Sequence, residues 1–317
     1  KLLNFSLWYL GWPKLDRLLG GVDVIFLPNI SFASISRRAK LILTIHDLSF
    51  ERCSEFFSWK RRLWHIFLNP RKLSKRADRI IAVSESTKND LVRLYGAEKE
   101  KIQVISSGVN DKFKKIDRND PKLVSVKEKY GLPWNFILYL GTLEPRKNAE
   151  SLIRAFGSLK KEARDLGDQE IMRYKLVLAG SSGWLEKGLT QRLEESEFRE
   201  DIILTKFIQE EDKVFVYNLA SLFVYPSFLE GFGFPPLEAQ RSEVPVIVSA
   251  NSSFPETVGE GALMIDPDRP TEIKEAIKIL IKDKKLREEM IRKGKRNSER
   301  FSWRVSAEKF SNLLKQI

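Results

Sequence analysis

Short apolar runs alternate with helical patterns along the whole chain, and this alternation limits the possible folds more than any other feature. Several runs are continuously apolar, which is typical of strands that are covered on both faces of a parallel sheet. Strands are predicted at 22–27, 40–45, 79–83, 101–105, 136–140, 174–179, 201–205, 221–225, 245–248 and 262–265. Helices are predicted at 60–77, 86–95, 148–162, 185–198, 210–219, 235–242, 271–281, 284–298 and 302–316. Repeated βα units of this kind predict a doubly wound α/β protein.

The alternation is interrupted once, by the polar segment 110–135, which carries Pro121, Gly131 and Pro133. A chain of 317 residues is longer than one core usually serves. The segment is therefore interpreted as the linker between two Rossmann-like halves. The first half shows four strands, whereas a complete half usually has about six.

Charge and cysteine content narrow the class of protein. Residues 1–116 hold 22 Lys and Arg against 11 Asp and Glu, so nearly all of the net charge of +12 lies in the first third. Such a surface attracts anionic lipid, phosphorylated ligands or nucleic acid. Cys53 is the single cysteine, which excludes an internal disulfide and fits a reducing compartment. No apolar run reaches the length of a membrane-spanning helix.

Residues 228–238 read FLEGFGFPPLE and place Glu230 and Glu238 around a glycine-aromatic turn. Glu230 follows a predicted strand, at the sheet edge where ligands bind in open α/β sheets. The Pro-Pro pair suits the start of a helix, so Glu238 is expected in a first turn, where the helix dipole favours an ionised carboxylate. Gly231 and Gly233 allow close backbone approach to a phosphorylated ligand. The same spacing also fits a glycine loop with a helix-capping glutamate.

Two other stretches follow predicted strands. Residues 139–148, YLGTLEPRKN, place Arg146 and Lys147 where cations can hold a diphosphate, although solvated surface charge fits equally well. His46, in TIHDLS, could contact a substrate or be a hydrogen-bonded structural residue. His65 has no such placement and is interpreted as structural. The sequence has no Cys/His cluster with zinc spacing, no GxxxxGK[ST] loop and no GxSxG motif.

Together these stretches resemble a known enzyme family. FLEGFGFPPLEA and the following PVIVSANSSFPETVGEGALMIDPDRP resemble the signature of family 4 glycosyltransferases, whose E-x7-E motif matches Glu230 and Glu238. YLGTLEPRKN resembles their phosphate-binding loop. TIHDLSF, IIAVSESTKNDL and VISSGVN resemble stretches of their first domain, and FSWRVSAEKF resembles their C-terminal helix. The resemblance covers nearly the whole chain, with the motifs in the family's order.

The resemblance implies the α/β GT-B architecture, in which two Rossmann-like doubly wound domains face each other across a cleft. The expected divisions are an acceptor-side domain at 1–115, a nucleotide-sugar-binding domain at 116–300, and a helix at 301–317 that crosses back to the first domain. Relatives begin with a further strand and a glycine-rich loop. The first domain is therefore expected to be truncated by about 50 residues.

The resemblance also implies roles for individual residues. Arg146 and Lys147 would neutralise the diphosphate, Glu238 would bind the ribose hydroxyls, and Glu230 would hold the donor sugar. The other implied donor-site residues are Gly231, Phe232, Gly233 and Phe234 through their backbone, Phe207 and Ile208 at the base pocket, and His46 beside the sugar. Relatives transfer a hexose with retention of anomeric configuration and without a metal, and the leaving phosphate takes the acceptor's proton.

The chain differs from the family pattern at three positions. Thr142 stands where many relatives have an arginine, and Arg146 would take over its work. A loop with Thr142 and Arg146 resembles that of a mannosyltransferase-like branch of the family. This resemblance favours GDP-mannose as the donor. Lys206 and Glu243 stand where relatives commonly have turn glycines, so the geometry of those two turns is in doubt.

The basic segment 59–76 mixes cations with Trp59, Trp64 and Phe67. Two interpretations stay open: an interfacial segment on an anionic leaflet, or a helix whose aromatic residues pack inward. The interfacial interpretation places the protein in the cytoplasm, peripherally on the inner face of the cytoplasmic membrane. There it would extend a saccharide or lipid-linked acceptor for a cell-surface polysaccharide or glycolipid. Alternatives are a sugar epimerase of the same architecture, a hydrolase using both glutamates, or a basic lipid- or nucleic-acid-binding protein with a degenerate transferase fold.

Overall fold

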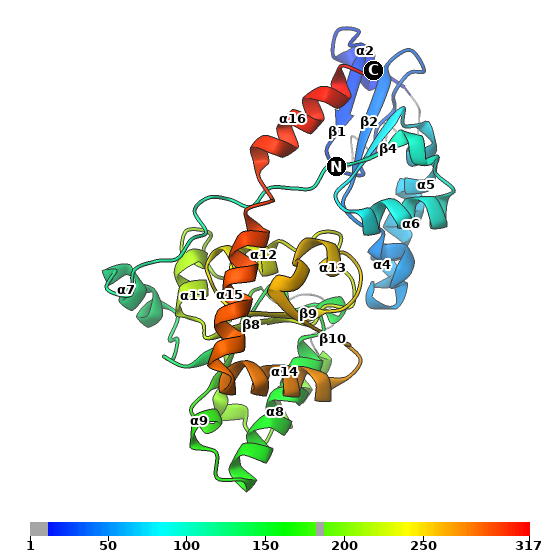
Figure 1. The fold of residues 1–317 in the computed structure, drawn as a ribbon. Helices are drawn as coiled ribbons and strands as arrows, with labels where there is room; N and C mark the ends of the chain where they lie inside the picture. Colours follow the sequence, from blue (N-terminus) through cyan, green and yellow to red (C-terminus); the bar gives the residue numbers. More distant parts are fainter. Residues whose placement is uncertain (1–11, 182–186) are drawn as a thin grey trace. The chain divides into compact units, whose positions relative to one another are not determined.

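The computed structural model describes residues 12–181 and 187–317, and the chain divides into two compact units (Figure 1). Unit 1 comprises the residues up to Ser107 together with Arg304–Ile317, and unit 2 comprises Gly108–Trp303. The segment 110–135, interpreted from the sequence as a linker, lies within unit 2 and carries a helix. In the described part of the chain, no helix is long and apolar enough to cross a membrane.

Unit 1 is built on a parallel sheet with the strand order β1-β2-β3-β4. The strands are β1 (Val24–Leu27), β2 (Lys40–Ile45), β3 (Arg79–Ala82) and β4 (Ile102–Val104). The helices are α2 (Leu15–Leu18), α3 (Ser49–Arg52), α4 (Trp59–Leu68), α5 (Pro70–Arg76), α6 (Glu85–Tyr95) and α16 (Trp303–Leu314), with short 3-10 turns η1 (Ser54–Phe56) and η2 (Lys99–Lys101).

The central strands of unit 1 are buried on both faces, which explains their continuous apolar sequence. Leu41 and Leu43 of β2 pack in one cluster with Leu91 of α6. Ile42, which points to the opposite face, packs with Leu313 of α16. The last helix of the chain therefore completes the core of unit 1.

The prediction of one helix over 60–77 was wrong, because the segment forms two helices. Asn69 ends α4 in the left-handed conformation, with φ 46°. Its side-chain oxygen accepts a hydrogen bond of 3.0 Å from the Lys72 backbone N–H and so caps α5. Pro70 accounts for the break, since a proline disfavours helical backbone at the preceding residue.

Unit 2 contains a parallel sheet with the order β10-β9-β8-β5-β6-β7. The strands are β5 (Phe136–Leu140), β6 (Lys175–Ala179), β7 (Ile202–Lys206), β8 (Leu222–Tyr225), β9 (Val246–Ser249) and β10 (Ala262–Ile265). The helices are α7 (Pro121–Lys129), α8 (Ala149–Asp165), α9 (Gln169–Met172), α10 (Lys187–Glu194), α11 (Lys213–Leu219), α12 (Phe234–Arg241), α13 (Phe254–Thr257), α14 (Pro270–Lys282) and α15 (Lys284–Ser298), with 3-10 turns η3 (Pro145–Lys147), η4 (Arg199–Asp201) and η5 (Gly259–Gly261).

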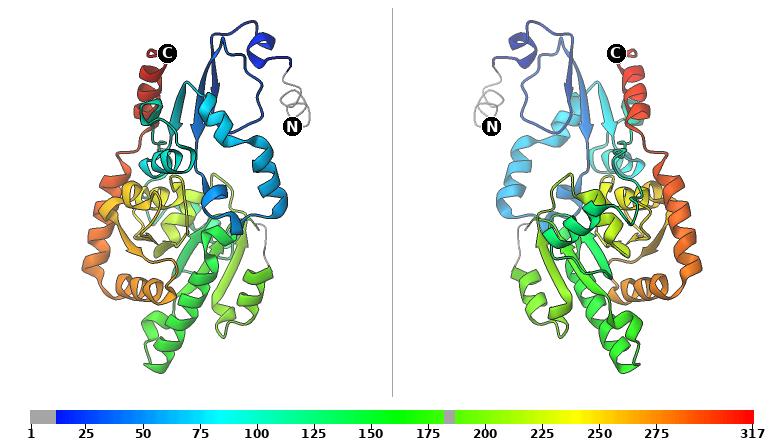
Figure 2. Two further views of the ribbon diagram at one scale, coloured as in Figure 1. Left: turned by 90° about the vertical axis from the view of Figure 1, so that its right-hand side faces the viewer. Right: turned by 90° about the vertical axis from the view of Figure 1, so that its left-hand side faces the viewer.

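Helices cover both faces of this sheet, with α11 and α12 on one side and α8 and α14 on the other (Figures 1 and 2). All ten predicted strands are present, with ends shifted by at most two residues. The first two residues of the helix predicted at 185–198 lie outside the described residues. Both sheets are parallel and flanked by helices, which confirms the doubly wound α/β prediction.

The strand order of unit 2 contains one reversal. From β5 the chain proceeds outward through β6 and β7, then returns to β8 on the other side of β5 and proceeds through β9 and β10. The loops after β5 and β8 therefore diverge at neighbouring strand ends. In open α/β sheets, ligands bind at such a switch point, outside the carboxyl ends of the strands.

The two turns that the sequence left in doubt adopt a left-handed backbone, which glycine takes up more readily than other residues. Lys206 has φ 60° and Glu243 has φ 58°, both in the left-handed region. Each turn therefore holds a residue with a side chain in a conformation that costs some strain.

Candidate active site

The loop after β5 is fixed by close backbone packing against the end of β6. The Gly141 N–H donates to the Ala179 carbonyl at 2.9 Å, and the Leu143 N–H donates to the Ser181 carbonyl at 3.0 Å. Gly180 has φ 145°, and a Cβ atom there would lie 2.0 Å from the Gly141 carbonyl oxygen. Only glycine fits at position 180, and the loop that carries Arg146 and Lys147 is held rigidly as a result.

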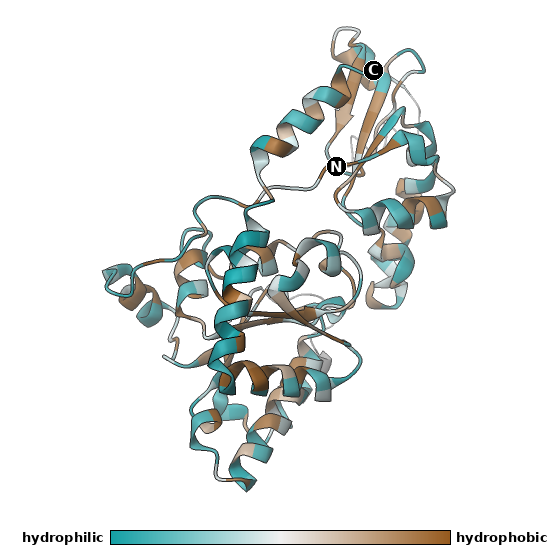
Figure 3. Ribbon diagram, viewed as in Figure 1, coloured by the Kyte–Doolittle hydropathy of each residue, from teal (hydrophilic) through white to brown (hydrophobic). Residues whose placement is uncertain are grey.

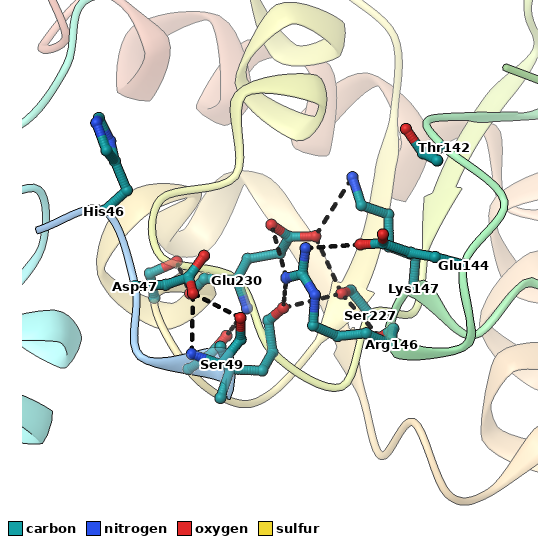
Figure 4. A network of polar contacts seen from close by, with 12 residues as sticks. His46, Asp47, Ser49, Thr142, Glu144, Arg146, Lys147, Ser227 and Glu230 are labelled. Carbon is teal, nitrogen blue, oxygen red and sulfur yellow. Dashed lines mark hydrogen bonds and ion pairs between the residues drawn. The ribbon is translucent and has the colours of Figure 1, made fainter. Parts of the chain in front are cut away.

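Four charged side chains gather where this loop meets the loop after β8 (Figure 4). Arg146 Nη2 lies 2.8 Å from Glu144 Oε1, and Arg146 Nη1 lies 3.4 Å from Glu230 Oε2. Lys147 Nζ lies 3.8 Å from Glu230 Oε1. These four side chains, Glu144, Arg146, Lys147 and Glu230, are named the switch-point cluster. All are mostly buried, and their formal charges sum to zero.

Glu230 is held by its neighbours as well as by the cations. Ser227 Oγ donates to Glu230 Oε1 at 3.1 Å, and the Tyr225 hydroxyl donates to the same oxygen at 3.3 Å. The Ser252 hydroxyl accepts from the Glu230 backbone N–H at 3.1 Å. Burial, together with the Glu230 charge, raises the pKa of Tyr225, so this phenol stays a hydrogen-bond donor. The Glu230 carboxylate is thus oriented before any ligand binds.

Arg146 directs its guanidinium toward protein groups. Besides the two carboxylates, Nη1 donates to the backbone carbonyl of Leu229, directly before Glu230. The loop after β5 is therefore tied to the loop after β8 through one side chain. This arrangement makes Arg146 a support for the Glu230 loop. Lys147 has only looser contacts, with Glu230 Oε1 at 3.8 Å and with the Tyr225 ring centroid at 5.5 Å, and so keeps hydrogen-bond donors for a ligand.

The glycine-aromatic segment starts α12 through close packing. Gly233 has φ 92° and precedes the helix, and a Cβ atom there would lie 2.7 Å from the Phe254 ring. Phe232 is buried against Phe301, with ring centroids 5.5 Å apart, whereas the Phe234 side chain is partly exposed. The Phe232 side chain therefore belongs to the core, and any contribution of this residue to a donor site would come from its backbone.

Glu238 corrects an expectation from the sequence. Helix α12 starts at Phe234, so Glu238 lies beyond the first turn, and burial raises its pKa where the sequence predicted a lowered one. The desolvation penalty outweighs both the nearby Lys213 and the hydrogen bond of 2.9 Å from the Tyr217 hydroxyl. The expected low pKa would have argued against Glu238 as a general acid, but the direction of the shift is the opposite, so this expectation is wrong.

Phe207 and Ile208, both expected at the base pocket, differ in their exposure to solvent. Phe207 follows β7 and is 66% exposed, whereas Ile208 is 2% exposed and packs inside unit 2. The Gly180 N–H donates to the Lys206 carbonyl at 2.7 Å, which brings this loop to the same edge of the sheet as the switch-point cluster. Phe207 is therefore exposed near that edge, whereas Ile208 belongs to the core.

In unit 1, the two histidines have different surroundings. His46 is exposed just after β2, and its Nε2 lies 2.9 Å from the Pro28 carbonyl oxygen. His65 stacks on Phe50 with ring centroids 4.1 Å apart, and burial lowers its pKa. His65 therefore has the structural role that the sequence predicted.

Sequence reasoning missed Glu144, Ser227 and Tyr225. Glu144 stands two residues before Arg146 in an irregular loop, where no periodicity indicates which side chains meet. Ser227 and Tyr225 were read only as the end of a buried strand. Among the described residues, no group of three His, Cys, Asp or Glu side chains is arranged to hold a metal ion.

Solved structures of the same fold cover nearly the whole chain. Sucrose-phosphate synthase from Thermosynechococcus elongatus superposes with a TM-score of 0.74 at 20% identity, over 93% of this chain and 74% of that chain. HepE from Anabaena, in complex with UDP and glucose, superposes with a TM-score of 0.76 at 17% identity, over 96% of this chain and 80% of that chain. The fold is GT-B, with two Rossmann-like domains.

Sequence comparisons are more specific. The model "Glycosyl transferases group 1" matches residues 125–297, and "Glycosyltransferase Family 4" matches residues 2–113. O-antigen chain mannosyltransferase B of Escherichia coli is 32% identical over 89% of this chain and 71% of its own length. Serotype-specific mannosyltransferase WbdA of Escherichia coli is 33% identical over 87% of this chain, which spans 34% of that longer protein. The chain belongs to the group 1, family 4 glycosyltransferases.

Proposed function

We propose that the chain transfers mannose from GDP-mannose to a saccharide or lipid-linked acceptor, with retention of anomeric configuration, in cell-surface polysaccharide or glycolipid synthesis. Support for the sugar comes from the relatives, several of which are O-antigen mannosyltransferases, including one from Salmonella typhimurium that is 29% identical over 74% of this chain and 59% of its own length. The observation that carries the proposal is the switch-point cluster, which presents two cations and an oriented carboxylate at the sheet edge where nucleotides bind.

In the proposed reaction, Lys147 binds the diphosphate and stabilises the negative charge that develops on it as the leaving group. Arg146 adds positive charge near the diphosphate while its guanidinium holds the Glu230 loop. Glu230 accepts hydrogen bonds from the donor sugar, and Glu238 accepts them from the ribose. The bond from the anomeric carbon to the phosphate oxygen breaks while the acceptor oxygen bonds to the same face, and the acceptor's proton passes to the leaving phosphate. No metal is assigned a role.

The proposal distributes the remaining residues around the donor. The Gly231–Phe234 backbone contacts the sugar-diphosphate, and Phe207 stacks on the base with Ile208 behind it. A role for His46 at the donor sugar stays a prediction. Catalysis then depends on positioning and on charge stabilisation, and needs no dedicated general base.

Ligand-dependent stabilisation followed by a transfer assay tests the proposal. A donor present at 100 times its dissociation constant should raise the free energy of unfolding by ~2.7 kcal/mol. We expect GDP-mannose to raise the melting temperature more than UDP-glucose or ADP-glucose, and Lys147→Ala to abolish the rise. No rise with any nucleotide-sugar would contradict a donor site. Mannose transfer to a lipid-linked oligosaccharide, followed by mass spectrometry, then identifies the reaction.

The raised pKa of Glu238 means that its ionisation no longer argues against a hydrolase. Family membership now carries that argument. The same assay separates the two activities, because a hydrolase would release free mannose from GDP-mannose at the same rate with and without acceptor, whereas a transferase would respond to the acceptor. An epimerase would leave the nucleotide attached and change only the sugar.

A further inference from the structure

A pocket lies in unit 2 at the edge of the sheet opposite to the switch-point cluster. Trp134 and Asn135 directly precede β5, Ser221 directly precedes β8, and Pro245 directly precedes β9. These four residues line the pocket, whose volume is ≈ 490 Å³, a size that holds a small molecule. Because β5 is five residues long, the pocket and the cluster lie about 15 Å apart along the strand. The described residues that line the pocket include none of the switch-point cluster, so the two sites are separate.

The wall of this pocket carries unbalanced positive charge. It holds three cations and one carboxylate, namely Lys115, Arg118, Arg287 and Glu243. Glu243 Oε1 already lies 2.6 Å from Lys295 Nζ, outside the pocket lining. Partial burial lowers the pKa of Lys115, and the attraction of Glu243 is too weak to reverse the shift. The pocket therefore lacks an anion that balances its cations.

The cations are held at the pocket by fixed backbone. The Ile116 N–H donates to Asn218 Oδ1 at 2.8 Å, and Asn218 Nδ2 donates to the Lys114 carbonyl at 2.9 Å. These bonds fasten the segment that carries Lys115 to α11. Arg287 of α15 is fastened by Nη1, which donates to two backbone carbonyls of α14 at 2.9 and 3.0 Å. A site that is ordered in advance loses less entropy when a ligand binds.

An apolar surface adjoins the cations. Trp134 is 65% exposed, and Lys127 Nζ lies 4.7 Å from its ring centroid, a contact that restrains the ring. Leu123 of α7, Leu280 of α14 and Ile291 of α15 also line the pocket. Figure 3 shows that α7 and α15 each mix apolar and hydrophilic residues. The pocket thus offers a flat aromatic side chain to a ring-shaped ligand.

Polar side chains complete the lining. Asn135, Tyr174 and Ser221 contribute an amide and two hydroxyls to the pocket wall. Amides and hydroxyls both donate and accept hydrogen bonds, as the hydroxyls of a sugar require. An aromatic ring, groups that bind hydroxyls and unbalanced cations together match a sugar that carries an anionic group.

We propose that this pocket binds a phosphorylated sugar, at a site distinct from the donor site. The phosphate binds Lys115 and Arg118, and the sugar ring lies against Trp134. Phosphate suits the cations better than a carboxylate does, because it carries more charge and more acceptor oxygens. Inorganic phosphate alone leaves the apolar surface unfilled, and an uncharged sugar leaves the cations unbalanced. This binding does not depend on the proposed donor or reaction.

Ligand-observed NMR titrations of the purified chain test the proposal, with mannose 6-phosphate as the probe. We expect a dissociation constant on the order of 10⁻⁴–10⁻³ M, and binding at least about ten-fold tighter than that of mannose or of inorganic phosphate. Lys115→Ala with Arg118→Ala should weaken binding by at least about ten-fold, because the phosphate loses its partners. Trp134→Leu should weaken binding by about five-fold, because the sugar loses the flat ring.

Matched controls remove equivalent side chains elsewhere. Arg154→Ala with Lys161→Ala removes two exposed cations of α8, and Trp59→Leu removes a tryptophan that is 69% exposed in unit 1. Both should keep wild-type binding of mannose 6-phosphate, and so should Lys147→Ala. The pocket variants should keep the wild-type melting temperature and the response to GDP-mannose, which separates this pocket from the donor site.

Four outcomes overturn the proposal. Mannose 6-phosphate does not bind, or it binds no tighter than inorganic phosphate. Binding persists in the pocket variants, or the α8 control weakens it equally. AMP serves as the alternative probe, and AMP that binds ten-fold tighter than mannose 6-phosphate in both wild type and Lys147→Ala would also contradict a sugar site.

Discussion

Arg146 lies between two carboxylates, 2.8 Å from Glu144 and 3.4 Å from Glu230, and it also binds the backbone carbonyl of Leu229. Arg146, which the sequence predicted to bind phosphate, thus links the loops after β5 and β8. A guanidinium suits this position because its fixed fork of donors can serve several acceptors at once. This link orients Glu230 before the substrate arrives.

Glu144→Gln should destabilise unit 2 although the residue touches no proposed substrate. The amide keeps the shape but leaves the mostly buried Arg146 charge less compensated. We expect a loss of ~1–3 kcal/mol in the free energy of unfolding, measured with urea. Glu288→Gln, which removes an exposed partner of Lys284 in α15, should change stability by less than ~0.5 kcal/mol. Equal effects of the two substitutions would show that Glu144 is not a structural partner.

Glu230→Gln should separate turnover from binding. Glutamine still accepts hydrogen bonds from Ser227 and Tyr225, so the loop keeps its shape. The lost charge no longer competes for Lys147, and donor affinity should stay within about three-fold or rise. We expect kcat to fall by ~10²-fold or more, as for the loss of a transition-state contact. Calorimetric donor affinity and initial rates check this, and a parallel fall in both quantities would refute the role.

Lys147→Ala should weaken the diphosphate contact in both the bound and the transition state. We expect kcat/KM to fall by about 10²–10³-fold, with a rise in the dissociation constant of GDP. Lys161→Ala, on the exposed side of α8, removes the same charge from a place remote from the cluster and should have no effect. If affinity for GDP is unchanged in Lys147→Ala, then Arg146 and not Lys147 carries the diphosphate.

Glu238→Gln should change how stability depends on pH. Burial raises the pKa of Glu238 above its ordinary value of 4.5, so the folded protein holds this proton more tightly than the unfolded chain. The resulting stabilisation is fully present below pH 4.5 and is lost as the pH rises through the folded-state pKa. Glu238→Gln should therefore be more stable than wild type at pH 8, and the difference should vanish near pH 4. Urea unfolding at several pH values measures it; a constant difference would exclude a raised pKa.

Gly180→Ala should disrupt the loop after β5. The new Cβ atom would lie 2.0 Å from the Gly141 carbonyl oxygen, and both partners are backbone at the core of the site. We expect more than ~3 kcal/mol of destabilisation by thermal or urea unfolding. Gly157→Ala in α8 is the control, because its Cβ atom would meet only Ser196 Oγ at 3.9 Å. That substitution should stabilise by ~0.5–1 kcal/mol, as expected inside a helix.

The sequence predicted most of the fold, because strands buried on both faces leave a continuous apolar signal. It failed where one residue overrides a pattern. Asn69 breaks the helix expected over 60–77, a break that Pro70 could have indicated. The pKa of Glu238 was predicted with the wrong sign, since the helix dipole is local and readable whereas burial depends on the tertiary fold.

For the site residues too, the sequence did not report contacts that depend on the tertiary fold. Arg146 and Glu230 could be picked out by motif, but their contact joins loops 84 residues apart, and no local pattern reports it. Phe207 and Ile208 are adjacent in sequence yet divide between the surface and the core. Motifs predict which residues gather at a site, whereas the packing decides which of them face a ligand.

The electrical neutrality of the switch-point cluster bears on the end of the catalytic cycle. In the proposed reaction, a diphosphate that binds Lys147 would draw this ammonium from the Glu230 carboxylate, 3.8 Å away, and the carboxylate would regain its partner when the diphosphate leaves. The Glu230 carboxylate would therefore replace the departing diphosphate as the partner of Lys147, so no anion from solution is needed there. We expect the nucleotide product to depart at a rate that salt changes little, and the emptied loops to keep their shape for the next donor.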